Sequence, residues 1–148
     1  MKGSGTITSK VTMPSRGGRM RLDAKAGYEA TTNWNVRDLF VGYAILECRT
    51  RPVIPHQIRF QLDAAGLPLA VDPLYGGATE LRLSSFKAGY RRSRRHDERP
   101  LIDRVSLHVQ SLTFPHPRDG HIVRFEAAVP KDFRAAVHQL DRFGRMPK

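Results

Sequence analysis

Three polar residues cluster at the start of a predicted helix, where their types are suited to holding an anion. His56, Gln57 and Arg59 follow Pro55, a residue that the first turn of a helix tolerates. The unpaired N–H groups of a helix N-terminus favour negative charge, and a guanidinium beside them would hold a carboxylate or a phosphate firmly. An arginine at such a position is also common on the surface, or pairs with an acid one turn on, here Asp63. Both interpretations remain open from these residues alone.

Other combinations of chemistry-bearing residues are weaker. The six histidines include no helical His/acid arrangement of the kind that binds zinc in metalloproteases, so we expect no metal site. His116 and His121 flank a predicted turn and are expected to face solvent or to hydrogen-bond to it. The sequence contains no Gly-x-Ser-x-Gly motif, and Ser106 with His108 on one strand suggests no catalytic pair. Nothing here supports a hydrolase with a Ser/His/Asp triad.

The charge is strongly positive and unevenly distributed. There are 25 Lys and Arg residues against 14 Asp and Glu residues, a formal net charge of +11. Residues 82–99 form a basic loop, and four of its arginines are candidates for RNA contact: Arg91, Arg92, Arg94 and Arg95. Because cations that neutralise phosphates release counterions, a polyanion is the leading partner. A solvated loop that serves solubility is the alternative, although loops also carry binding residues.

Length and composition are typical of one globular domain in a reducing compartment. The 148 residues are 40% hydrophobic and 26% charged, which is too apolar for a disordered chain. The single cysteine, Cys48, excludes an intramolecular disulfide and any site with several thiolates, and strand alternation predicts that it lies in the core. No apolar run approaches the ~20 residues that cross a membrane, and the first residues lack the apolar stretch of a signal peptide. We therefore expect a cytoplasmic protein that has no membrane partner.

Hydrophobic periodicity predicts an α+β fold with a mixed, mostly antiparallel sheet and flanking helices. Residues 1–28, rich in Gly, Ser, Lys and Arg, are interpreted as an irregular segment with at most a short strand near 6–8. The expected strands cover 31–36, 41–50, 107–114 and 122–129. The expected helices begin at Pro55 and after Pro130, and they end at Gly66 and Gly144. In the last strand, alternate residues from Val123 to Val129 are expected to point inward.

Several blocks of this sequence resemble, in order, the motifs of the RluA-type RNA pseudouridine synthases. Residues 56–62 (HQIRFQL), 66–69 (GLPL) and 71–76 (VDPLYG) resemble the run around that family's His-Gln-Ile-Arg motif. Residues 107–117 are similar to its Leu-His-Ala and Leu-x-Phe-x-His-Pro segment, and residues 130–133 to its closing Pro-x-Asp-Phe. Residues 27–34 resemble the Gly-Lys-x-Ala-x-Thr-x-Tyr strand. The ordered matches cover most of the chain, from about Gly27 to Leu140.

The resemblance implies an enzyme that converts uridine to pseudouridine in structured RNA, ribosomal or transfer, without a metal or a cofactor. In that family an aspartate attacks the target nucleotide, the glycosidic bond breaks, and the base rotates and rejoins through carbon. The resemblance implies that Arg59 pairs with this aspartate and keeps it charged. It also implies that His56, Gln57, Leu74 and Tyr75 bind the substrate, since the target base must leave the stack. For Leu74, ordinary core packing is the alternative.

Three departures from the family pattern shape the prediction. The Arg-Leu-Asp-x-x-Thr-Ser-Gly block that carries the nucleophile is absent, and so is the Lys-x-Tyr block that usually follows it. The family's Thr-Gly-Arg-Thr stretch reads Pro-Val-Ile-Pro here, at residues 52–55. Arg21-Leu22-Asp23 repeats three letters of the nucleophile block, but too little chain separates it from the strand at 31–36 for Asp23 to be a good candidate.

We therefore interpret residues 29–148 as the C-terminal part of a pseudouridine synthase catalytic domain. The isolated chain is expected to be inactive, and a complementary N-terminal chain is a possible partner. Two alternatives remain: a non-catalytic, basic RNA-binding module, and the product of a truncated gene.

Overall fold

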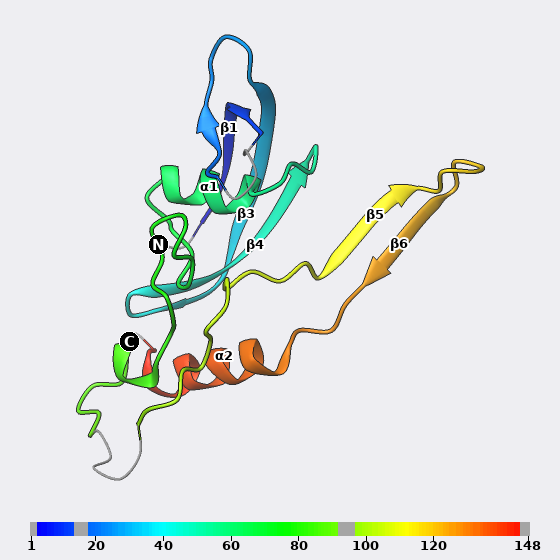
Figure 1. The fold of residues 1–148 in the computed structure, drawn as a ribbon. Helices are drawn as coiled ribbons and strands as arrows, with labels where there is room; N and C mark the ends of the chain where they lie inside the picture. Colours follow the sequence, from blue (N-terminus) through cyan, green and yellow to red (C-terminus); the bar gives the residue numbers. More distant parts are fainter. Residues whose placement is uncertain (1–2, 14–17, 92–96, 146–148) are drawn as a thin grey trace.

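Four strands come first in the chain, and two helices enclose a second pair of strands after them. The computed structural model describes residues 3–13, 18–91 and 97–145. In chain order the elements are β1 (Ser4–Thr12), β2 (Arg21–Leu22), β3 (Tyr28–Phe40), β4 (Tyr43–Arg51), α1 (Gln57–Ala64), the 3-10 turn η1 (Leu83–Ser85), β5 (Ser111–Pro115), β6 (Ile122–Glu126) and α2 (Lys131–Phe143) (Figure 1). The α+β class with antiparallel strands is confirmed.

Four strands form the main sheet in the order β2-β1-β3-β4, and each neighbouring pair is antiparallel. The β3 and β4 strands make a long hairpin that turns at Val41 and Gly42. Gly42 has a φ of 76°, a conformation that tight hairpin turns require and that glycine adopts without a steric penalty. This hairpin carries the chain to the start of α1.

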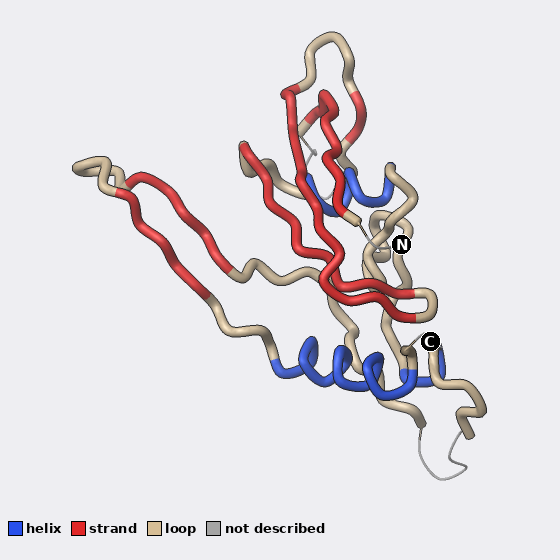
Figure 2. The backbone as a smooth tube through the Cα atoms, turned by 180° about the vertical axis from the view of Figure 1, so that it is seen from behind, coloured by secondary structure: helices blue, strands red, loops and turns tan. Residues whose placement is uncertain are grey.

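Helix α1 lies against one face of this sheet, as both ribbon views show (Figures 1 and 2). Amide side chains of the helix hydrogen-bond to the strands. Gln61 is fully buried; its Nε2 donates to Ala30 O and Ser9 Oγ, both at 2.8 Å, and its Oε1 accepts from Thr32 Oγ1 at 2.6 Å. These bonds fix the position of the helix relative to β1 and β3.

The N-terminal segment is more regular than the sequence indicated. Residues 4–12 form β1, which pairs with β3 along eight residues and also holds β2. The strand is mostly polar: Val11 is buried in the core, and polar side chains pair across the strands, for example Thr8 Oγ1 with Thr31 Oγ1 at 3.0 Å. An irregular 1–28 segment is therefore the wrong description for this stretch, because cross-strand hydrogen bonds stabilise a strand that has little hydrophobic periodicity.

The buried apolar residues form two clusters. The first contains Val11, Met20, Ala30 and Tyr75. The second core, between α2 and the long irregular segment after α1, contains Val71, Leu81, Ile102 and Ala136. The end of α2 is also joined to the β3–β4 turn, because Val41 N–H donates to Gly144 O at 2.7 Å. The predicted end of this helix at Gly144 is confirmed.

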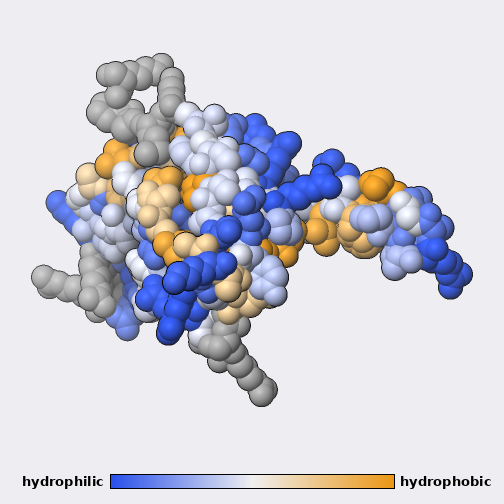
Figure 3. All heavy atoms as spheres, turned by 90° about the horizontal axis from the view of Figure 1, so that it is seen from above, coloured by the Kyte–Doolittle hydropathy of each residue, from blue (hydrophilic) through white to orange (hydrophobic). Residues whose placement is uncertain are grey.

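The β5–β6 hairpin projects from the rest of the chain as an arm (Figure 1). Phe114 and Phe125 stack on each other with ring centroids 5.9 Å apart, yet they are 37% and 58% exposed. Apolar residues are visible along the arm in the space-filling view (Figure 3). The expectation that the alternate residues of β6 point inward is wrong, because the described chain supplies no second layer to cover them. No described helix is long and apolar enough to span a bilayer.

Candidate functional site

A buried ion pair joins α1 to the loop that follows it. Arg59 donates from Nε to Asp72 Oδ2 and from Nη2 to Asp72 Oδ1, both at 2.7 Å. The Asp72 side chain is 1% exposed and the Arg59 side chain is 16% exposed. Such a bidentate, largely desolvated pair is geometrically specific. The interpretation in which Arg59 pairs with Asp63 is wrong, because Arg59 reaches across to this loop.

Asp72 also organises the loop at residues 72–77. Its Oδ1 accepts from the N–H groups of Leu74, at 3.1 Å, and Tyr75, at 3.3 Å, and its carbonyl accepts from Gly77 N–H at 2.9 Å. A Cβ on Gly77 would collide with the main chain of Leu69 and Asp72, so only glycine fits there. The loop is consequently a tight turn built around one carboxylate.

Tyr75 is the centre of the site and is 1% exposed. Its hydroxyl accepts from Met20 N–H at 2.7 Å and lies 3.0 Å from His56 Nδ1. The two side chains share a hydrogen bond in which either group can be the donor, according to the tautomer of His56. The guanidinium carbon of Arg59 lies 5.1 Å from the Tyr75 ring centroid, and Phe60 packs edge-on against the same ring.

The charges at the site are set by these contacts. Burial opposes ionisation of Asp72, but the Arg59 hydrogen bonds and charge, with the loop N–H groups, outweigh burial and lower the pKa of Asp72. The hydrogen bonds to Asp72 raise the pKa of Arg59. Burial, followed by the nearby charge of Arg59, lowers the pKa of His56. At neutral pH the site therefore contains a charged pair beside a mostly neutral imidazole.

The predicted site residues differ in how much of their surface remains open. His56, at the N-cap of α1, has a φ of 64°, a left-handed conformation that is uncommon for a residue with a side chain, and it is half-buried. Leu74 is half-buried against the cluster that contains Tyr75. Gln57 is buried; its Nε2 donates to Thr31 O at 2.9 Å. Of the predicted set, His56, Arg59 and Tyr75 are brought into contact, while Gln57 turns toward the sheet.

The other candidates lie elsewhere. Asp23 accepts through Oδ1 from the N–H groups of Lys25 and Ala26, both at 3.0 Å, so its carboxylate closes a turn. These hydrogen bonds lower the pKa of Asp23. Arg91 is exposed. Its three companions in the basic loop, Arg92, Arg94 and Arg95, lie outside the described residues.

Two residues of the site were not among the sequence candidates. Asp72, the partner of Arg59, stands in the Asp-Pro-Leu-Tyr-Gly motif and was detectable only as part of that motif. Arg19 lies with its guanidinium carbon 5.2 Å from the Tyr75 ring centroid. It comes from a segment with no periodicity, and no sequence signal placed it here.

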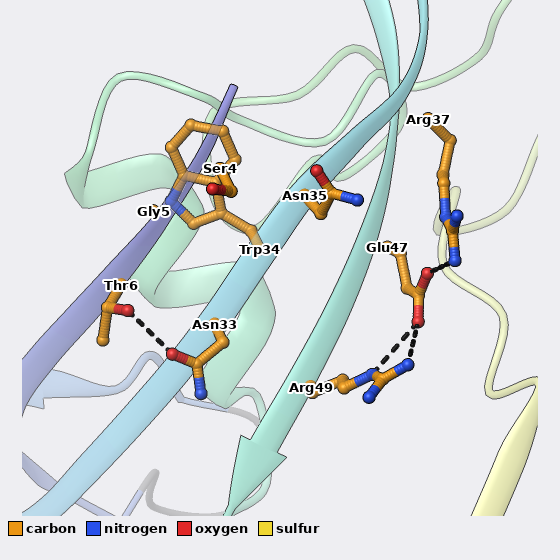
Figure 4. Close-up of a pocket in the computed structure, with 9 residues that line it drawn as sticks. All are labelled: Ser4, Gly5, Thr6, Asn33, Trp34, Asn35, Arg37, Glu47 and Arg49. Atoms are coloured by element: carbon orange, nitrogen blue, oxygen red, sulfur yellow. Dashed lines mark hydrogen bonds and ion pairs between the residues drawn. The ribbon is translucent and has the colours of Figure 1, made fainter. Parts of the chain in front are cut away.

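A separate hollow lies on the main sheet, where β1, β3 and β4 meet (Figure 4). Its volume is about 370 Å³, and most of the residues that line it are of polar types. In it, Glu47 binds both Arg37 and Arg49, and Asn33 accepts from Thr6 Oγ1 at 2.7 Å. None of the residues that line this hollow belongs to the Arg59 site.

His116 and His121 meet at the tip of the β5–β6 arm. Both Nδ1 atoms contact Asp119 Oδ1, at 3.1 and 2.5 Å, and the two rings stack 4.7 Å apart at 19°. Two histidines and a carboxylate are possible ligands for a metal ion. In the structure the three side chains are joined by hydrogen bonds, which close the turn between β5 and β6.

Comparison with known proteins finds relatives over most of the chain. It is 27% identical over 140 residues to the uncharacterized RNA pseudouridine synthase YlyB of Bacillus subtilis, covering 95% of this chain and 40% of the relative. It is 32% identical over 114 residues to the ribosomal large subunit pseudouridine synthase D of Xanthomonas campestris, covering 77% and 33%. With the chloroplastic RNA pseudouridine synthase 2 of Arabidopsis thaliana the identity is 35% over 134 residues, covering 87% and 30%. No family model matches. The chain thus spans about a third of the length of these relatives.

Proposed function

The chain belongs by sequence to the RNA pseudouridine synthases, and we propose that it supplies the arginine side of a pseudouridine synthase active site. The reaction class is an intramolecular isomerisation of uridine in RNA. The observation that carries this proposal is the geometry of Arg59, a guanidinium of the matching motif that Asp72 binds on one edge and that is 16% exposed.

Arg59 has unused donors for a second carboxylate. Its side edge, Nε with one N–H of Nη2, is used by Asp72. Its end edge, Nη1 with the other N–H of Nη2, makes no hydrogen bond to any residue that the structure describes. A guanidinium presents five N–H donors in a fixed fork, so it can bind one carboxylate on each edge. The end edge is the proposed place for the attacking aspartate, which another stretch of polypeptide supplies.

The residues around Arg59 have proposed roles that follow from their surroundings. A carboxylate enclosed by a base and by protein would be neutralised on desolvation, and the Arg59 charge opposes this. His56 and Leu74 retain exposed surface and can contact the target nucleotide directly. Gln57 and Tyr75 are buried and contribute by holding α1 and the 72–77 loop in place.

RNA is the proposed substrate and partner. Ribosomal RNA is favoured because pseudouridine synthase D of Xanthomonas is named for the large ribosomal subunit, and transfer RNA is the alternative. The net charge of +11 fits either. A complementary chain carrying the nucleophile is part of the proposal. A cytoplasmic location is also proposed, from the reducing environment that a single cysteine indicates.

A second candidate function is a non-catalytic RNA-binding module. It is favoured by the Arg59–Asp72 pair itself, which balances the charge of the site without any further acid. A truncated gene product is the remaining alternative. It would leave apolar residues uncovered, as on the β5–β6 arm.

The RNA-binding part of the proposal can be tested on the chain as it is. We expect a fluorescein-labelled ribosomal RNA stem-loop to bind with log affinity that falls with log salt by about 0.7–0.9 per phosphate contacted. Replacing Arg91, Arg92, Arg94 and Arg95 by Ser should flatten this slope. The matched control replaces four exposed arginines elsewhere by Ser: Arg118, Arg124, Arg134 and Arg142. Equal flattening by both sets would show that the basic loop is no binding element, and an absence of RNA binding would refute the proposed function.

A further inference from the structure

A second arginine, Arg19, is anchored to the Tyr75 ring from a distant part of the chain. Its guanidinium carbon lies 5.2 Å from the ring centroid, and the Arg59 carbon lies 5.1 Å from the same centroid. The next residue, Met20, donates its buried N–H to the Tyr75 hydroxyl at 2.7 Å. Arg19 is therefore held in place by a cation–π contact and by the main chain beside it.

The two arginines differ in how their charge is compensated. Arg59 is bound on one edge by a buried carboxylate at 2.7 Å. The Arg19 side chain is 54% exposed, and its ion pair is with Asp63, at 3.9 Å between Nη2 and Oδ2. An exposed single contact at that distance contributes little. Within the described part of the chain, the Arg19 guanidinium donates no hydrogen bond, so its donors are available to a ligand.

We infer that Arg19 is an anion-binding residue at the rim of the Arg59 site, and that its ligand is a backbone phosphate of RNA. The inference rests on the proposed function, since a target nucleotide beside Arg59 brings its own phosphates to the rim. The planar fork of a guanidinium matches two phosphate oxygens, and the Tyr75 contact orients that fork in advance. Arg59 and Arg19 thus have separate tasks, the first toward a carboxylate and the second toward the substrate.

The test compares two arginines of the same segment. Arg19→Gln removes the proposed contact. Arg21→Gln is the matched control, because Arg21 is exposed, lies two residues further on in β2, and carries the same charge. Binding of a fluorescein-labelled, uridine-rich RNA stem-loop is measured by anisotropy across a salt series. We expect Arg19→Gln to weaken binding about fivefold at low salt and to reduce the salt slope by about 0.7, the value for one phosphate of a single strand. Arg21→Gln should stay within about twofold of wild type.

Equal effects of the two substitutions, or no effect of Arg19→Gln, would overturn the inference while leaving the proposed function intact. If the wild-type chain binds no RNA, the proposed function fails first and the inference fails with it. Equal thermal unfolding midpoints for the three proteins exclude a folding defect.

A second readout separates RNA from free phosphate. The ¹⁵Nε resonance of Arg19, assigned by its loss in Arg19→Gln, should shift on addition of the RNA. Inorganic phosphate at the same phosphate concentration should leave it in place. A shift of the same size with inorganic phosphate would show a simple anion site and would contradict the proposed ligand.

Discussion

The Arg59–Asp72 pair is the residue-scale feature on which the site depends. The pair fixes the first turn of α1 to the 72–77 loop, and the same carboxylate holds the loop N–H groups. Tyr75, His56 and Arg19 are positioned through that loop. The catalytic geometry that we propose is therefore also a stability feature, and the two can be measured separately.

Arg59→Gln should destabilise the fold strongly. It leaves the buried Asp72 carboxylate without its counter-charge, a loss of about 3 kcal/mol or more in the free energy of unfolding. The control is Arg104→Gln, which breaks a pair of similar geometry, 2.8 and 3.0 Å to Asp132, whose side chains are 42% and 34% exposed. That change should cost less than about 1 kcal/mol. Urea unfolding followed by Trp34 fluorescence measures the free energy of unfolding of both variants. Equal losses would contradict the difference in burial between the Arg59–Asp72 and Arg104–Asp132 pairs.

At the scale of elements, the sequence predicts those parts whose periodicity matches their burial. Helix α2 was predictable because its helical stripe coincides with a buried face. The strands β3 and β4 were predicted only in part, since the expected ranges 31–36 and 41–50 miss the extension of β3 to Phe40 and the turn that follows it. β1 was not, because hydroxyl and amide bonds hold it in the sheet. On α1 the sequence gives no sign that Gln61 is buried, because hydrogen bonds to β1 and β3 satisfy its polar amide.

The burial of the β5–β6 arm could not be predicted from its sequence. The alternation of apolar and polar residues correctly predicted two strands and a turn. It does not show whether another part of the protein covers the apolar face of those strands. The contacts of the Arg59 site could not be predicted from residue spacing either. Asp72 binds Arg59 and Arg19 lies on the Tyr75 ring through tertiary contacts.

Replacing Phe114 and Phe125 together by Ser should lower the free energy of unfolding of the isolated chain by less than about 2 kcal/mol, because both residues are partly exposed and lie outside the buried clusters. The same replacement should reduce self-association in sedimentation velocity, since an uncovered apolar arm promotes it. Phe133→Ser, in the second core, is the comparison and should cost about 2 kcal/mol or more. An equal loss from the arm variant would mean that the arm is packed against the body in solution.

At the scale of the whole molecule, the chain combines a basic surface, an uncovered arm and an arginine with one open edge. We propose that RNA binds the basic surface, that further polypeptide covers the arm, and that an attacking carboxylate binds the open edge of Arg59. The relatives are about three times as long as the stretch they share with this chain, which is consistent with part of the site being supplied from elsewhere.

The most direct test of the account is tritium release from ribosomal RNA labelled at C5 of uridine, measured with the isolated chain. Pseudouridine formation frees that tritium, and we predict no release above background, because we propose that another stretch of polypeptide supplies the nucleophile. Sustained release, lost in Asp23→Asn or Asp72→Asn, would contradict the account and place the nucleophile within these 148 residues.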